Sequence, residues 1–224
     1  MPNLYLLRHL KSQWNLEDRF AGWVDNPLSQ EGRENAKNAA LKLKGEEFDI
    51  AYTSPLIRNE ETVLLVLRNL GDKYPLFKHL RGKMKDWGNF KGAGNYVPVY
   101  VSEELNERYY GDLQGMDREE AKSEFGEEQF NKWRRGFEFR PPKGESLKDT
   151  YKRTVPFFKK NIEKNLKSGN NVLIIGSHNA LRSIAKYIEK ISDKDIINFE
   201  IPYGGLVKYE LDDSLNFKNK KVVA

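Results

Sequence analysis

The chain has 224 residues, of which 38% are hydrophobic and 32% charged, and its formal net charge is +5 at pH 7. This composition is too apolar for a disordered chain and too polar for a membrane span, since the longest apolar runs are only as long as strands. The sequence has no cysteine, which excludes disulfides, thiolate nucleophiles and zinc–thiolate sites. Together with the lack of a visible signal peptide, it indicates a cytoplasmic protein.

The first part of the chain alternates between buried strands and amphipathic helices. Residues 3–8 (NLYLLR) form a short apolar run that predicts a strand. Ser29 can cap a helix, whose inner face would be formed by Ala36, Ala39, Ala40 and Leu43. Residues 49–53 (DIAYT) predict a second strand, and the next helical stripe consists of Val63, Val66, Leu67 and Leu70.

The stretch from residue 71 to residue 100 lacks this periodicity. It is rich in glycine and lysine, so we expect an irregular insertion that ends in a strand near residues 97–101. We find no repeat, low-complexity stretch or linker elsewhere. The sequence therefore predicts a single domain over residues 1–224.

Regular patterns return after residue 145. Ser146, followed three residues later by Asp149, predicts the start of a helix that Pro156 is expected to kink. A buried strand at 172–175, a helix and a final strand at 206–211 follow, and we expect the tail Lys218–Lys221 to fray. Alternating strands and helices predict an α/β fold in which a mostly parallel sheet is flanked by helices.

Two of the three histidines lie where predicted strands end, since the segment LYLLRH ends at His9 and the segment VLIIGSH ends at His178. Ligands bind beyond the carboxyl ends of the strands in open α/β sheets. A single histidine at such a place is more often structural, but two equivalent ones, one preceded by Arg8, favour a site. Imidazole accepts phosphoryl groups well because its ordinary pKa lies near neutrality. Without cysteine, a Ser-His-Asp order or a P-loop, the pattern indicates a phosphohistidine route.

Arginines near the predicted element boundaries support an anion site, because guanidinium groups match phosphate and carboxylate oxygens. They are Arg8, Arg58, Arg108, Arg134, Arg135 and Arg182. A general acid is also needed, but the residues alone do not select one among 33 carboxylates. The lysines are scattered and no nucleic-acid-binding signature occurs, so we expect neither a nucleic-acid nor a membrane partner.

Seven segments in the same order resemble the cofactor-dependent (2,3-bisphosphoglycerate-dependent) phosphoglycerate mutases of the histidine phosphatase superfamily. They are LLRHLKSQWNLEDRFAGWVDNPLSQEG, YTSPLIRNEETV, ELNERYYGDLQGMDREEA, FGEEQFNKWRRGF, GESLKDTYKRTVPFF, VLIIGSHNALRSIAKYIEKISD and IPYGGLVKYEL. The resemblance implies a three-layer α/β fold and the interconversion of 3-phosphoglycerate and 2-phosphoglycerate. It also implies priming by 2,3-bisphosphoglycerate, no metal, small phosphorylated three-carbon acids as partners, and a homodimer or higher homo-oligomer.

The resemblance also implies a role for individual residues. His9 would be the phosphorylated nucleophile and Glu107 the general acid and base. The phosphate pocket would be lined by Arg8, Arg58 and His178, with Asn15, Gly22 and Asn179 nearby. The carboxylate end of the substrate would be held by Tyr110, Arg134 and Arg135, with Arg118 standing where the family usually has a substrate-binding lysine.

Several positions depart from the family pattern at the site. Leu10 stands where the family has glycine, Lys11 where it usually has an acidic residue, and Ala21 where it has serine or threonine. The second histidine block, from His178 to Arg182, reads one residue shorter than usual. These changes leave two alternatives open: a histidine-dependent phosphomonoesterase, in which water accepts the phosphoryl group, or a catalytically weakened binder of phosphate ligands.

Overall fold

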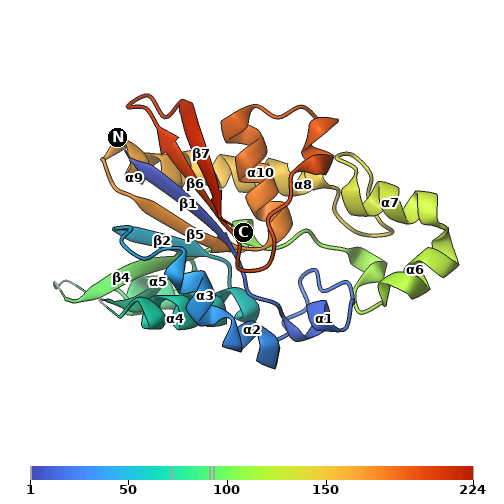
Figure 1. Ribbon diagram of the computed structural model, residues 1–224, viewed down its shortest axis with the longest axis horizontal. Helices are drawn as coiled ribbons and strands as arrows, with labels where there is room; N and C mark the ends of the chain where they lie inside the picture. The colour runs from blue at the N-terminus through green and yellow to red at the C-terminus, as the bar shows by residue number, and fades with distance from the viewer. Residues whose placement is uncertain (1, 72, 91, 93, 224) are drawn as a thin grey trace.

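A single seven-stranded sheet runs through the computed structural model, which describes residues 2–71, 73–90, 92 and 94–223. The strand order is β3-β4-β2-β5-β1-β6-β7 (Figure 1). The strands are β1 (Asn3–Arg8), β2 (Ile50–Thr53), β3 (Tyr74–His79), β4 (Tyr96–Val101), β5 (Val172–Gly176), β6 (Leu206–Leu211) and β7 (Phe217–Val223). The pairs β1–β5, β2–β5, β2–β4 and β3–β4 are parallel, whereas β6 pairs antiparallel with both β1 and β7. The predicted fold class is confirmed.

Helices cover both faces of the sheet. The α-helices are α1 (Gln13–Leu16), α2 (Gln30–Glu34), α3 (Ala36–Leu41), α4 (Ile57–Leu70), α5 (Gly82–Trp87), α6 (Arg118–Phe125), α7 (Glu127–Arg135), α8 (Leu147–Phe157), α9 (Glu163–Lys167) and α10 (His178–Glu189). Short turns of other helix types are η1 (Glu103–Leu105), η2 (Gly111–Leu113), η3 (Phe158–Ile162) and η4 (Asp195–Asn198). None of the helices in the described ranges is both long and apolar enough to cross a membrane.

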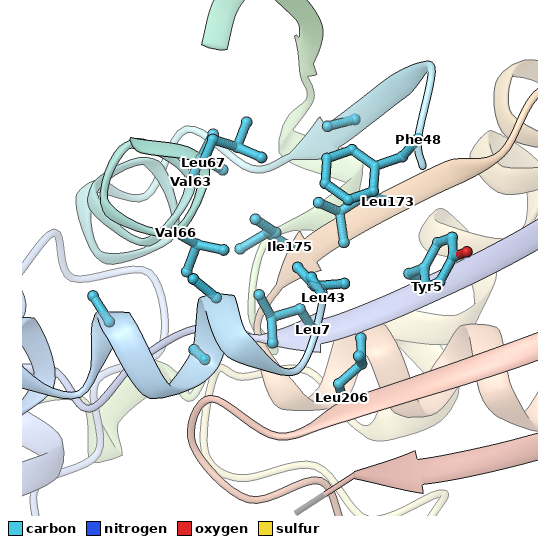
Figure 2. Packing of buried hydrophobic residues seen from close by; sticks show 14 of the residues in the cluster. Tyr5, Leu7, Leu43, Phe48, Val63, Val66, Leu67, Leu173, Ile175 and Leu206 are labelled. Carbon is cyan, nitrogen blue, oxygen red and sulfur yellow. The ribbon is translucent and has the colours of Figure 1, made fainter. Parts of the chain in front are cut away.

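The two central strands, β1 and β5, are apolar on both faces because helices cover both faces. Tyr5 and Leu7 of β1 point to the core that α3 and α4 cover, as Figure 2 shows. Leu4 and Leu6 point to the opposite core, beneath α10 and η3. Beyond the end of the sheet where β1 finishes, α6 and α7 project to one side (Figure 1). The carboxyl ends of the central strands therefore lie on the side of the sheet toward which α6 and α7 project.

Two expectations from the sequence are wrong. The segment from 71 to 100 is not irregular, because it forms β3 and α5 before the expected strand β4. The tail Lys218–Lys221 does not fray but lies within β7, which pairs with β6. Pro156 does lie inside a helix, and η3, a turn of π-helix, follows it. The continuity of one sheet from β1 to β7 supports the proposal of a single domain.

Candidate active site

The carboxyl ends of β1 and β5 bring the two histidines together. The strands are neighbours, with Arg8 opposite Gly176, and the backbone N–H of His9 donates to the Gly176 carbonyl at 3.0 Å. They open into a cavity of about 210 Å³. Its walls are formed by Arg8, His9, Asn15, Arg19, Phe20, Ala21, Gly22, Arg58, Glu107, Tyr110, Arg118, Arg134, Arg135, His178, Asn179, Arg182, Glu200 and Tyr203. Every residue to which the resemblance gives a role lies in this wall, although the individual roles stay predictions.

His9 lines the cavity, yet only 3% of its surface is exposed. Its Nδ1 atom is 2.6 Å from the backbone carbonyl oxygen of Leu10. Because a carbonyl only accepts, Nδ1 carries the proton and Nε2 keeps its lone pair. Burial, followed by the charges of Arg58 and Arg8, lowers the pKa of His9 well below its ordinary value. The side chain is therefore a neutral imidazole suited to nucleophilic attack.

Arg58 supplies a fixed positive charge beside His9. It lies in the first turn of α4 and is almost completely buried, and its guanidinium donates to the carbonyl oxygens of Gly22 at 2.7 Å and Val24 at 3.0 Å. Gly22 has φ +53°, a conformation that disfavours a side chain, and a Cβ there would overlap Gln114. The loop therefore approaches Arg58 closely enough to anchor it. Burial lowers the Arg58 pKa, with Glu107 acting in the opposite direction.

Glu107 is held from three sides and has 8% of its surface exposed. Its Oε1 atom accepts from the backbone N–H of Arg108 at 2.6 Å and from the Asn179 side-chain amide at 2.7 Å. Its backbone carbonyl accepts from Arg153 at 2.8 Å and from the Trp23 indole at 2.6 Å. A carboxyl group fixed in this way suits proton transfer, which needs a short and repeatable approach to the substrate oxygen.

A second group of cations lines the far side of the cavity. Arg118 begins α6, and Arg134 and Arg135 end α7, so the projecting helices supply them. Burial and the nearby charges of Arg118 and Arg135 lower the pKa of Arg134. This crowding of like charges is relieved when an anion binds. Tyr110 joins the group, with its hydroxyl 3.2 Å from the amide nitrogen of Asn179.

His178 is the first residue of α10 and faces Glu200. Its Nε2 atom is 3.2 Å from Oε2 of Glu200, and the backbone N–H of Ile201 approaches the same atom at 3.4 Å. Burial and the charges of Arg8 and Arg182 lower the His178 pKa well below its ordinary value. The Glu200 side chain is 53% exposed, so solvent weakens this pair. Glu200 also pairs with Arg135 at 3.5 Å.

The two remaining arginines of the predicted cluster differ in position. Arg182 lines the cavity, donates to Oδ1 of Asn179 at 3.0 Å, and has its pKa lowered to about 10 chiefly by burial. Arg108 is fully buried behind the wall and donates to the Arg134 carbonyl at 3.0 Å. Arg108 therefore supports the site without lining it.

Two of the departures from the family pattern, Leu10 and Lys11, do not line the cavity. Leu10 is fully buried in the core that α3 and α4 cover, and its backbone is not left-handed. Lys11 pairs with Glu31 at the surface. Ala21 does line the cavity. The helix α10 begins at His178 directly after β5 and Ser177, and it still places Asn179 and Arg182 in the wall.

Four cavity residues were not identified from the sequence: Arg19, Phe20, Glu200 and Tyr203. Arg19 and Phe20 lie in the first resembling segment, and Tyr203 lies in the last. Their position inside these segments is the sequence feature that could have identified these three residues. Glu200 lies just outside the last segment, and nothing in the pattern singles it out.

The cavity suits an anionic ligand. Seven of its wall residues are arginines, against two glutamates. The Nε atoms of Arg8, Arg118 and Arg182 are buried and lack a hydrogen-bond partner within the described residues. Free buried donors of this kind fit phosphate and carboxylate oxygens. Across the described residues, no group of three histidine, aspartate or glutamate side chains is placed to share a metal ion.

The family profile described as histidine phosphatase superfamily (branch 1) matches residues 4–93 and 89–220. The chain belongs to this superfamily. It is 46% identical to the 2,3-bisphosphoglycerate-dependent phosphoglycerate mutase of Methanococcus vannielii, over 99% of this chain and 97% of the relative. It is 40% identical to 2,3-bisphosphoglycerate-dependent phosphoglycerate mutase 1 of Gloeobacter violaceus, over 100% of this chain and 99% of the relative. Its fold also resembles that of the solved mycobacterial glucosyl-3-phosphoglycerate phosphatase, with a TM-score of 0.77 and 19% sequence identity. The match covers 99% of this chain and 98% of the solved chain.

Proposed function

We propose that this histidine phosphatase superfamily member is a 2,3-bisphosphoglycerate-dependent phosphoglycerate mutase that interconverts 3-phosphoglycerate and 2-phosphoglycerate. The observation that carries the proposal is the two-ended cavity. A neutral histidine flanked by Arg8 and Arg58 lies at one end, and Arg118, Arg134 and Arg135 lie at the other. A phosphorylated three-carbon acid carries both a phosphate and a carboxylate, one anionic group for each set of cations. Full-length relatives that carry the name of this enzyme support the same assignment.

In the proposed reaction, Nε2 of His9 attacks the phosphorus of a bound phosphate ester. The N–P bond forms as the P–O bond of the ester breaks, and Glu107 gives its proton to the departing oxygen. In the return half, Glu107 takes a proton from the accepting hydroxyl, whose oxygen receives the phosphoryl group from His9. Arg8, Arg58 and His178 would neutralise the transferring group, which is the main task of a site for phosphoryl transfer.

Priming by 2,3-bisphosphoglycerate fits the same residues. One phosphate would lie at His9 and the remaining anionic groups against Arg118, Arg134, Arg135 and Tyr110. Asn15, Gly22 and Asn179 line the wall between them and would complete the contacts. The proposed chemistry requires no metal.

The test is a coupled assay with 3-phosphoglycerate, with and without 2,3-bisphosphoglycerate. We expect turnover that depends on the primer, together with phosphate attached to His9. A His9→Asn variant should lose both while remaining folded, and a His79→Asn variant, whose histidine lies on β3 outside the cavity, should keep both. Folded protein that is inactive with the primer would refute mutase activity. Release of inorganic phosphate at a rate above mutase turnover would instead establish the phosphomonoesterase.

We also infer a cytoplasmic homodimer or higher homo-oligomer that binds neither nucleic acid nor membrane. β3 is an edge strand with one neighbour and exposes Tyr74, and the following helix α5 exposes Met84 and Trp87. An unpaired edge with exposed apolar side chains suits contact with a second copy. Light scattering on the purified protein measures the mass, and a monomer at micromolar concentration would contradict this inference.

A further inference from the structure

The turn from Ile201 to Gly205 is fastened to the segment that carries the nucleophile. The backbone N–H of Gly204 approaches the carbonyl oxygens of Arg8 at 3.2 Å and His9 at 3.3 Å, and Arg8 N–H donates to the Gly205 carbonyl at 3.0 Å. Lys42 donates to the Gly204 carbonyl at 2.9 Å. Gly204 has φ +66°, and a Cβ there would lie 3.1 Å from the Leu10 side chain. Tyr203 therefore has a fixed backbone directly beside His9.

The ring of Tyr203 lies against the guanidinium of Arg8. The guanidinium carbon is 3.8 Å from the ring centroid, and the Arg8 Nη1 donates to the Ile201 carbonyl at 2.7 Å. Stacking uses the flat face of the guanidinium and does not block the N–H donors, which lie in its plane. The buried Nε of Arg8 has no partner within the described residues. The turn thus fixes the plane of Arg8 while leaving donors for a ligand.

The same ring reaches the other parts of the phosphate end. Its centroid is 5.8 Å from that of the His9 ring, at an interplanar angle of 46°. The Tyr203 side chain lines the cavity and is only partly exposed. It is therefore in contact with the one arginine that directly precedes the nucleophile, at the end of the cavity where phosphate would bind.

We propose that Tyr203 is a positioning residue for phosphoryl transfer, whose ring fixes the Arg8 guanidinium beside the phosphate on His9. This proposal rests on the proposed function for its reaction. Transition-state charge is stabilised best by donors held in place beforehand, and a displacement of about 1 Å can lower the rate about 100-fold. Without the ring, Arg8 keeps its charge but loses the constraint on one face.

The test compares Tyr203→Phe with Tyr203→Leu. Phenylalanine keeps the stacking face, so its kcat should stay within about threefold of the original, whereas leucine should lower kcat and the rate of His9 phosphorylation about 10- to 100-fold. The KM for 3-phosphoglycerate should change little, because the carboxylate contacts lie at the other end. A Tyr187→Leu variant is the matched control, since it removes a ring from Lys159, 4.6 Å away, outside the cavity.

A double-mutant cycle tests whether Tyr203 acts through Arg8. In an Arg8→Lys background, the further loss caused by Tyr203→Leu should nearly vanish, because lysine has no planar group to hold. Additive losses, a Phe variant as slow as the Leu variant, or a Leu variant with unchanged kcat would each overturn the proposal. Thermal unfolding of each variant checks folding, and Tyr203→Met replaces the Leu variant if that one unfolds.

Failure of this proposal is distinguishable from failure of the proposed function. If the unmodified protein does not turn over 3-phosphoglycerate, the mutase assignment fails. Hydrolysis of p-nitrophenyl phosphate, which needs His9 and Arg8 but no carboxylate contacts, then compares the same Tyr203 variants. A Leu variant as fast as the unmodified protein in that assay would overturn the role of Tyr203 on its own.

Discussion

The side-chain amide of Asn179 donates to the carboxylate of Glu107 at 2.7 Å, which ties the proposed acid–base group to the first turn of α10. Glu107 and Asn179 are 72 residues apart in the chain, and both are buried. The same amide approaches the Tyr110 hydroxyl at 3.2 Å. Asn179 therefore sets the position of Glu107 relative to the groups at the far end of the cavity.

Replacing Glu107 by Gln should lower kcat about 100- to 10,000-fold while leaving KM within a few-fold. Glutamine keeps the shape and can still accept from Arg108 and Asn179, but it cannot deliver a proton. Steady-state kinetics with 3-phosphoglycerate measure both constants, with Glu103→Gln, an exposed neighbour outside the cavity, as the control. A variant that only raised KM would show that Glu107 binds substrate rather than transferring protons.

The stability of the protein should fall as the pH drops below about 6.5. His9 and His178 have folded-state pKa values below the unfolded value, so the unfolded chain binds more protons in this range. Stability is complete above about pH 6.5 and is lost between that pH and the lower folded pKa values, by up to about 1.4 kcal/mol per pH unit for each histidine. Urea unfolding at pH 7.5, 6.5 and 5.5 measures the slope.

The matched comparison for this pH dependence is His9→Asn, which should have a shallower slope than the unmodified protein. His79→Asn serves as the control for the loss of a histidine as such. Equal slopes for the unmodified protein and His9→Asn would mean that His9 does not become protonated on unfolding, contrary to the buried neutral imidazole described above.

Replacing Glu200 by Gln should strengthen substrate binding. Glu200 pairs with Arg135 and faces His178, so an incoming carboxylate or phosphate must compete with it. Because the side chain is exposed, we expect a gain of about 0.5–1 kcal/mol, which corresponds to a KM lower by about two- to fivefold. Glu210→Gln, an exposed residue on β6, is the control. An increase in KM would indicate that Glu200 orients His178 for binding instead.

Replacing Leu10 by Ala should destabilise the protein by about 2–5 kcal/mol with little change in kcat. The side chain is fully buried among Ala39 and the other residues of the core beneath α3, and it does not reach the cavity. Urea unfolding and the mutase assay measure the two effects. Unchanged stability with an altered rate would mean that Leu10 acts on the substrate after all.

The central strands, and the histidines at their ends, were predictable because a strand buried on both faces consists of a continuous run of apolar residues. The two edge strands were not. β3 contains Pro75 and β7 is rich in lysine, and both features are common at sheet edges, where backbone groups lack a partner and charge prevents aggregation. Their sequences therefore resemble loops.

The site was predictable where a resembling segment carried it, as for His9 and Glu107. The contacts of Glu200 and Tyr203 were not, because they depend on how the turn before β6 folds back over Arg8. Such a path is set by backbone hydrogen bonds of Gly204 and Gly205, which leave no periodic pattern. The burial of Leu10 in the core was not predictable either, because the sequence alone does not tell in which direction a residue after a strand points.

The position of β1 between β5 and β6 has a consequence for synthesis. Within the described residues, β1 pairs with β5 and β6, which begin at residues 172 and 206, so during synthesis it has no strand partner until more than 160 further residues have been added. His178, Glu200 and Tyr203, which line the cavity with His9, are likewise made long after β1. We therefore expect nascent chains that end before β6 to lack both a closed sheet and any phosphoryl-transfer activity.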